Sequence, residues 1–274
     1  MPSFAMPFDF SGRHVFIAGG TSGINLGIAH AFAGAGAKLC VLSRSADKVE
    51  AAVAALKMHG GAVAGHVADV RDYAAVEAAL KAAVALHGKI DVLVSGAAGN
   101  FPAPALGMSA NGFKAVIDID LLGTFHVLRA GFAHLQKPGA SIINISAPQA
   151  YNPMEFQMHV CAAKAGVDMV TRVGAIEWGP AGVRVNSVVP GPIADTEGMK
   201  RLAPTPETEK IVVDSVPLGH MGTVDDIANC CLWLASPMAR YVTGTVIPVD
   251  GGWSLGGTSV SATGMKNALL GGKP

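Results

Sequence analysis

The sequence is poor in charge, in cysteine and in long apolar runs, and each shortage excludes a class of protein. Only 15% of its 274 residues are charged, and 20 Lys and Arg balance 20 Asp and Glu. No net field therefore favours nucleic acid or an acidic membrane surface. The four cysteines lack zinc-site spacing and lie in apolar segments, as reduced core thiols do. No stretch reaches the roughly 18 apolar residues of a membrane span. We expect no nucleic acid, membrane or metal partner.

The chain has the size and composition of one folded unit. Its 274 residues, 50% hydrophobic, are enough for one large core and few for two independent ones. The opening segment MPSFAMPFDFSG has no basic region followed by an apolar run, as a secretory signal would have. We expect a single domain over residues 1–274 and a cytoplasmic location.

Short apolar runs alternate with helix-length segments. Seven strands are predicted at 14–18, 38–43, 61–67, 91–95, 141–146, 183–189 and 245–249. The runs are apolar on both faces, and helical patterns such as 73–87 and 155–178 separate them, which predicts a parallel sheet covered by helices on both sides. The predicted fold class is therefore α/β: a doubly wound, or Rossmann, parallel sheet of seven strands. Residues 190–222, a Pro-flanked insertion of mixed charge, predict a substrate lid.

A glycine-rich segment follows the first predicted strand. Residues 19–25, GGTSGIN, open a helix whose backbone N–H groups and dipole can bind a pyrophosphate; the alternative is a glycine-rich turn without a ligand. The second strand ends in Ser43 and Arg44, where an NAD site has an acidic residue on the ribose hydroxyls. Because a guanidinium there can pair with a 2′-phosphate, we expect NADPH. Asp47 nearby, and the ordinary role of Arg as a surface charge, are the opposing observations.

Six motifs in order resemble the short-chain dehydrogenase/reductase family from about residue 11 to 255. They are GGTSGIN, VADV around Asp69, SGAAGN at 95–100, Lys164, NSVVPGPI at 186–193 and VDGG at 249–252. Three departures matter. Ser95 and Gly96 stand where the family has asparagines, and Asn25 replaces a usual glycine. Val160 stands four residues before Lys164, where the family carries its catalytic tyrosine.

Within that family the chain looks like the 2,4-dienoyl-CoA reductases, particularly the peroxisomal type. The similar segments are GAAGNF at 96–101, FKAVIDIDLLGTF at 113–125, EWGP at 177–180, PGPIADTEG at 190–198 and LASPMARYVTG at 234–244. These enzymes reduce a conjugated thioester and dispense with the usual Ser and Tyr pair. The resemblance implies NADPH-dependent reduction of a 2,4-dienoyl-CoA, a chemistry of fatty acid metabolism. It also implies a homotetramer formed through the helix that carries Ala162, Ala163 and Gly166.

The resemblance also implies roles for individual residues, with Asp69 at the adenine and Lys164 at the nicotinamide ribose. Together with the glycine-rich segment, the expected cofactor contacts are Gly19, Thr21, Ser22, Gly23, Ile24, Ser43, Arg44, Asp69, Val70, Ala97, Ala98, Gly99, Lys164, Pro190, Gly191, Pro192, Ile193 and Thr196. The expected substrate contacts are Arg71, Phe101, Ser109, Asn111 and Arg201. Of these, Arg71 and Arg201 could hold the phosphates of the acyl-CoA, which needs basic residues near the pocket.

The proton donor is the least determined part of the site. We assign the acid chemistry to Asp120, which stands where the family usually has an asparagine and could orient and polarise a water. Tyr151, thirteen residues before Lys164, could instead reach the site from a loop. Asp250, in the VDGG motif, is either an assisting carboxylate or an ordinary turn residue. His159, beside the site, is interpreted as structural.

Two other functions are compatible with the sequence. One is a reductase of the same family that acts on another activated alkene or carbonyl, with Tyr151 as the acid. The other is a non-catalytic dinucleotide-binding protein that kept the fold after losing Ser and Tyr. The presence of Lys164, Asp120 and the PGPI loop favours an enzyme.

Overall fold

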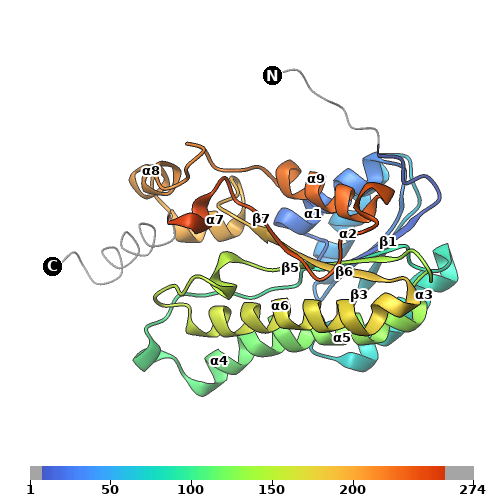
Figure 1. The fold of residues 1–274 in the computed structure, drawn as a ribbon, viewed down its shortest axis with the longest axis horizontal. Helices are drawn as coiled ribbons and strands as arrows, with labels where there is room; N and C mark the ends of the chain where they lie inside the picture. The colour runs from blue at the N-terminus through green and yellow to red at the C-terminus, as the bar shows by residue number, and fades with distance from the viewer. Residues whose placement is uncertain (1–7, 257–274) are drawn as a thin grey trace.

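The structure is a computed structural model that describes residues 8–256, and a parallel sheet of seven strands forms its centre (Figure 1). The strand order is β3-β2-β1-β4-β5-β6-β7. The strands are β1 (His14–Ala18), β2 (Lys38–Ser43), β3 (Val63–Val67), β4 (Val92–Ser95), β5 (Ser141–Ile145), β6 (Arg184–Pro190) and β7 (Val246–Val249). Each overlaps its predicted run, and each neighbouring pair is parallel. The predicted doubly wound α/β fold is confirmed.

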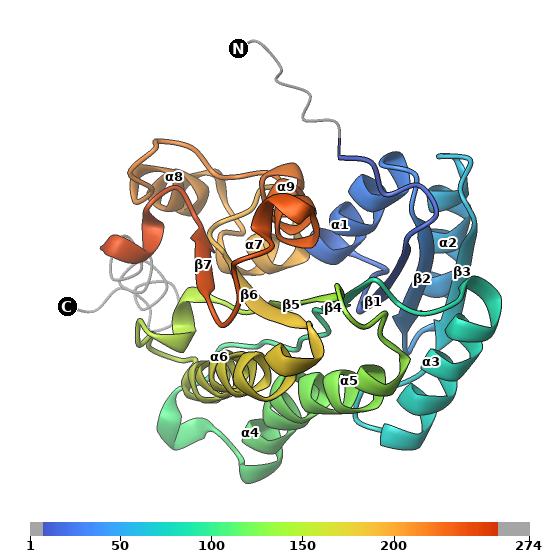
Figure 2. The ribbon, with the colours of Figure 1, turned by 45° about the vertical axis from the view of Figure 1, so that its right-hand side comes forward.

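Helices cover both faces of the sheet, and Figures 1 and 2 show the two layers on opposite sides. One layer holds α1 (Gly23–Gly34), α2 (Ala46–Lys57) and α9 (Val224–Ala235). The other holds α3 (Tyr73–His87), α5 (Gly123–Gly131) and α6 (Met158–Trp178). The short α4 (Ala110–Val116) runs into α5 through a π-helical turn, η2 (Ile117–Leu122).

The apolar runs on the central strands are continuous because each of these strands supplies two cores. In β1, Val15 and Ile17 belong to the cluster under α1 and α9, whereas Phe16 and Ala18 belong to the cluster under α3 and α5. Successive side chains of a strand point to opposite faces, so a sheet buried on both sides has no polar face to alternate with.

The parallel direction of the strands places their carboxyl ends at one edge of the sheet. The glycine-rich loop after β1, Arg44 after β2, Asp69 after β3 and the loop after β4 therefore meet there. The chain order reverses between β1 and β4, which is the usual position of a ligand site in an open α/β sheet.

The predicted lid forms two helices on a fixed base. After β6 the chain enters α7 (Glu197–Leu202) and α8 (Pro206–Asp214). The two ends of this excursion are joined, because Gly222 N–H donates to Pro192 O at 2.9 Å and Ala194 N–H donates to Gly222 O at 2.9 Å. Its action as a lid stays a prediction.

The small residues of α6 have a packing role inside the chain. Ala163 is fully buried, and a Cβ on Gly166 would lie 2.8 Å from Leu121 Cδ1, so α6 and η2 approach too closely for a larger side chain. The tetramer stays a prediction. No helix in residues 8–256 is long and apolar enough to cross a membrane.

Candidate active site

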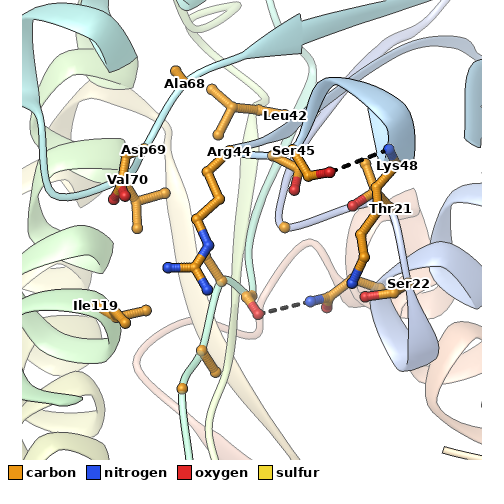
Figure 3. Close-up of a pocket in the computed structure, with 17 residues that line it drawn as sticks. Thr21, Ser22, Leu42, Arg44, Ser45, Lys48, Ala68, Asp69, Val70 and Ile119 are labelled. Atoms are coloured by element: carbon orange, nitrogen blue, oxygen red, sulfur yellow. Dashed lines mark hydrogen bonds between the residues drawn. The ribbon is translucent and has the colours of Figure 1, made fainter. Parts of the chain in front are cut away.

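A cavity of about 470 Å³ lies at the carboxyl ends of β1 to β4 (Figure 3). Its walls include ten of the residues predicted to bind the cofactor: Gly19, Thr21, Ser22, Ser43, Arg44, Asp69, Val70, Ala97, Ala98 and Gly99. Seven other residues were not predicted: Asn25, Leu42, Ser45, Lys48, Ala68, Gly96 and Ile119. The predicted contacts Gly23, Ile24, Lys164 and Pro190 to Thr196 are not among its lining residues. Its position and its lining make the cavity the candidate for the adenosine and phosphate end of a dinucleotide site.

The glycine-rich loop packs directly against the loop after β4. Gly19 has a φ of +82°, and a Cβ there would lie 2.8 Å from the backbone of Ala97. Asn25 Nδ2 donates to Gly96 O at 2.7 Å, and a Cβ on Gly96 would overlap the Asn25 amide. The two departures from the family pattern therefore fit each other. The Asn25 side chain occupies the space that a side chain at position 96 would need.

Two positively charged side chains, Arg44 and Lys48, line the cavity beside the start of α2. Figure 3 shows the Arg44 guanidinium in the middle of the cavity and the Lys48 side chain extending toward Thr21 and Ser22. Ser45 caps α2 by accepting from Lys48 N–H at 3.4 Å, which fixes the backbone of the first turn. Lys48 comes four residues after Arg44, and that spacing was the signal the sequence offered. Asp47 is not among the lining residues.

Asp69 and Arg71 form a fork at the edge of the cavity. Arg71 Nη2 lies 2.6 Å from Asp69 Oδ2, and Arg71 Nε donates to Asp69 Oδ1 at 3.0 Å. The hydrogen bonds from Arg71 lower the pKa of Asp69 below its ordinary value. Asp69, predicted to contact the adenine, is therefore paired with Arg71, predicted to contact the substrate. Both contacts stay predictions.

A buried ion pair joins Lys164 to Asp120. Lys164 Nζ lies 3.3 Å from Asp120 Oδ2, and the two side chains are 7% and 1% exposed. Lys164 Nζ also donates to Ile145 O at 3.0 Å, and Asp120 Oδ1 accepts from Gly99 N–H at 2.7 Å. Buried charges need such additional partners, because desolvation otherwise exceeds their attraction. Both Asp120 oxygens are engaged, whereas one of the three Lys164 N–H donors is left for a ligand.

The sequence prediction missed Asp168, a buried carboxyl one helical turn after Lys164. It is 4% exposed, and its Oδ1 has no hydrogen-bond partner among residues 8–256. Burial raises the pKa of Asp168, while the Ser146 and Ser187 hydroxyls and the charges of Arg172 and Lys164 partly oppose the rise. A raised pKa makes a carboxyl a better proton donor near neutral pH. The signal in the sequence was an Asp on the buried face of α6.

Tyr151 and Asp250 lie in the same neighbourhood as Asp168. Burial raises the pKa of Tyr151, and the negative charges of Asp250 and Asp168 raise it further, against a hydrogen bond with Ser254. Asp250 accepts at 2.9 Å from both Gly252 N–H and Ser254 N–H. The turn role that the sequence left open for Asp250 is therefore present.

A buried apolar side chain, Val160, occupies the position of the missing tyrosine. Val160 is buried and contacts the apolar cluster of Val116 and Ala163. Val160 therefore leaves no phenol four residues before Lys164, so any acid must come from another position.

The predicted substrate contacts have mixed surroundings. Phe101 is 39% exposed, whereas Ser109 caps α4 by accepting from Gly112 N–H at 3.0 Å. Asn111 lies on α4 and Arg201 on α7, and both are exposed. Within residues 8–256 no group of three or more metal-ligating side chains is arranged to hold an ion.

A doubly wound sheet, a glycine-rich loop at the start of α1 and a buried lysine on α6 define a dinucleotide-binding oxidoreductase. The chain belongs to the short-chain dehydrogenase/reductase family. A family model described as enoyl-(acyl carrier protein) reductase matches residues 18–254.

Curated relatives and solved structures agree with this assignment. The peroxisomal 2,4-dienoyl-CoA reductase of Rattus norvegicus is 44% identical and is aligned over 86% of this chain and 82% of its own. A probable 2,4-dienoyl-CoA reductase of Bacillus subtilis is 38% identical over 88% of this chain and 96% of its own. The citronellol catabolism dehydrogenase of Pseudomonas aeruginosa superposes with a TM-score of 0.80 at 35% identity, covering 93% of this chain and 100% of that one.

The exchange between positions 25 and 96 predicts a compensating pair of substitutions. Gly96→Ala places a methyl group on the Asn25 amide, and we expect the Kd for NADPH to rise about tenfold or more because the two loops separate. Adding Asn25→Gly removes the overlap and should restore most of the affinity, measured by fluorescence titration. Asn25→Gly alone loses one hydrogen bond, so it should weaken binding only a few-fold. A double variant as weak as Gly96→Ala would contradict this account.

Proposed function

We propose that the protein is an NADPH-dependent 2,4-dienoyl-CoA reductase. One observation carries the proposal: the buried Lys164–Asp120 pair is present beside the dinucleotide cavity, while Val160 replaces the phenol that protonates a carbonyl. A conjugated thioester needs no such phenol, because its charge spreads to the thioester oxygen and its proton goes to carbon. The curated relatives named above as 2,4-dienoyl-CoA reductases support the same substrate class.

The residues at the cavity fit the cofactor. Gly19 lets the glycine-rich loop pack against the backbone of Ala97 at the cavity wall, and Arg44 and Lys48 supply two positive charges for a 2′-phosphate. The free N–H of Lys164 is suited to a ribose hydroxyl, and Asp120 positions that ammonium through the ion pair. When bound, the reduced nicotinamide supplies a hydride to the distal carbon of the diene.

The remaining step is protonation of the α-carbon. Asp120, our sequence-based acid, uses both oxygens to hold Gly99 and Lys164, so we propose it as a positioning residue. Asp168 has an unpartnered oxygen within the described chain and a raised pKa, and we propose that it delivers the proton, directly or through a water. One hydride and one proton then give a 3-enoyl-CoA. Arg71 and Arg201 are proposed to hold the acyl-CoA phosphates.

The first test follows NADPH absorbance with a medium-chain trans,trans-2,4-dienoyl-CoA. We expect rapid oxidation with this substrate, none with a simple ketone, and a 3-enoyl-CoA as product by mass spectrometry and NMR. Tight NADPH binding without turnover of any thioester would contradict the proposed function. A 2-enoyl-CoA product would keep the reductase but contradict the position of protonation.

Substitution of Arg44 and Lys48 tests the preference for NADPH over NADH. Arg44→Ala and Lys48→Ala should each raise the Kd for NADPH about tenfold, since each removes one charged hydrogen-bonding partner of a phosphate. The Kd for NADH should stay within about twofold, because NADH has no 2′-phosphate. Equal losses for both cofactors would mean that the cations bind the pyrophosphate instead.

The proton donor is tested by the pH dependence of kcat. Because the pKa of Asp168 is raised, its protonated form persists to higher pH than an ordinary carboxyl, and kcat should fall as pH rises through that pKa. Asp168→Asn should lower kcat about 10²-fold and abolish this limb. Tyr151→Phe is the matched control and should keep both the wild-type kcat and its fall at high pH. The reverse result would favour a reductase of another activated alkene or carbonyl with Tyr151 as acid.

A further inference from the structure

The imidazole of His159 is completely buried and has no polar partner within residues 8–256. Its exposure is 0%, and neither Nδ1 nor Nε2 has a hydrogen-bond partner there. Lys164, a buried side chain of the same helix, donates to Ile145 O, and Gln157, which precedes the helix, accepts from Gln149. A buried histidine that makes no hydrogen bond destabilises the fold, because its ring nitrogens lose the hydrogen bonds that they would make with water. The sequence interpretation of His159 as structural does not account for it.

His159 lies next to the substrate side of the site. It immediately precedes Val160, which occupies the place of the missing tyrosine, and the Phe101 ring packs edge-on against it at 4.6 Å between centroids. Phe101 follows the cavity residue Gly99 by two positions and is itself 39% exposed. One partly exposed aromatic ring therefore borders the buried imidazole on the side of the site.

The backbone around His159 is strained at one position. Phe156 has a φ of +66°, a left-handed conformation that a bulky residue rarely adopts. Its carbonyl accepts from Ala103 N–H at 2.8 Å, which ties the segment before α6 to the loop that carries Phe101. Strain of this kind persists where the surrounding structure fixes a side chain in a required place. Here it fixes the start of α6, and with it the imidazole, against the Phe101 loop.

The surroundings of His159 match the chemistry of a conjugated thioester. Such a thioester is apolar except for its carbonyl oxygen. Phe101 and Met108 provide apolar surface here, and the His159 imidazole is the polar group beneath it. A neutral imidazole has one N–H donor to give to that oxygen. During hydride addition the oxygen gains negative charge, and a donor in a dry site then stabilises it strongly.

We propose that His159 donates a hydrogen bond to the thioester carbonyl oxygen of the acyl-CoA, with Phe101 turning aside to admit it. The inference rests on the proposed function and adds a catalytic residue to it. The bond holds the carbonyl in place before the reaction and stabilises the enolate that forms, while Asp168 and Lys164 serve the α-carbon and the cofactor.

His159→Leu separates this role from a structural one. Removal of two unpartnered buried nitrogens should leave Tm unchanged or higher. With 2,4-dienoyl-CoA, kcat should fall about 10²-fold, the usual loss of one oxyanion donor, while the Kd for NADPH stays within about twofold. His66→Leu is the matched control. His66, in β3, also has a buried Nε2 without a hydrogen-bond partner within residues 8–256, and its ring stacks on that of Phe16 in β1. This variant should keep wild-type kinetics. Unchanged kcat in a folded His159→Leu protein would overturn the proposal.

A spectroscopic measurement gives a second readout of the same bond. The dienoyl-CoA labelled with ¹³C at the thioester carbon is bound to wild-type protein with NADP⁺, which cannot reduce it. We expect a carbonyl stretching frequency lower than in an aprotic solvent, a smaller lowering in His159→Leu, and partial recovery in His159→Gln, which keeps an N–H donor. A wild-type frequency equal to that in the aprotic solvent, or an equal lowering in wild-type and folded His159→Leu protein, overturns the inference. Turnover by the wild-type protein reports the proposed function separately, so failure of one is distinguishable from failure of the other.

Discussion

The buried pair of Lys164 and Asp120 is the interaction on which the site depends. It joins four segments, because the pair links η2 to α6, Asp120 also binds Gly99 in the loop after β4, and Lys164 also binds Ile145 at the end of β5. Removal of either partner would leave an uncompensated charge in the interior, which typically costs 3–5 kcal/mol. The π-helical turn η2, which carries Asp120 between α4 and α5, makes this contact possible, and such turns often occur at functional sites.

In the proposed mechanism, this arrangement compensates for the missing tyrosine. The carboxylate oxygens of Asp120 are committed to positioning, so the acid must stand elsewhere, and α6 places Asp168 one turn beyond Lys164. Val160 fills the tyrosine position with apolar packing, and burial separately raises the pKa of Asp168.

The sequence predicted the sheet well and the side-chain partnerships poorly. Strands buried on both faces have unbroken apolar runs, so their limits lie within about two residues of those predicted. The glycine-rich loop, Arg44 and the loop after β4 were predicted because their function depends on local backbone position. Lys48 and Asp168 were missed because their roles depend on which way a helical side chain points. The pairing of Arg71 with Asp69 was within reach of the sequence, since the two residues are only two positions apart.

The exchange of Asn25 and Gly96 bears on whether the dinucleotide site is functional. Taken singly, each departure from the family pattern resembles decay of a motif. In the structure, two glycines would leave the loops without their hydrogen bond, and two larger side chains would overlap. The chain instead has one asparagine and one glycine, a combination that forms the hydrogen bond without an overlap. A protein that had lost its ligand would have no constraint to keep such a match, so the exchange favours a working cofactor site over a non-catalytic relic.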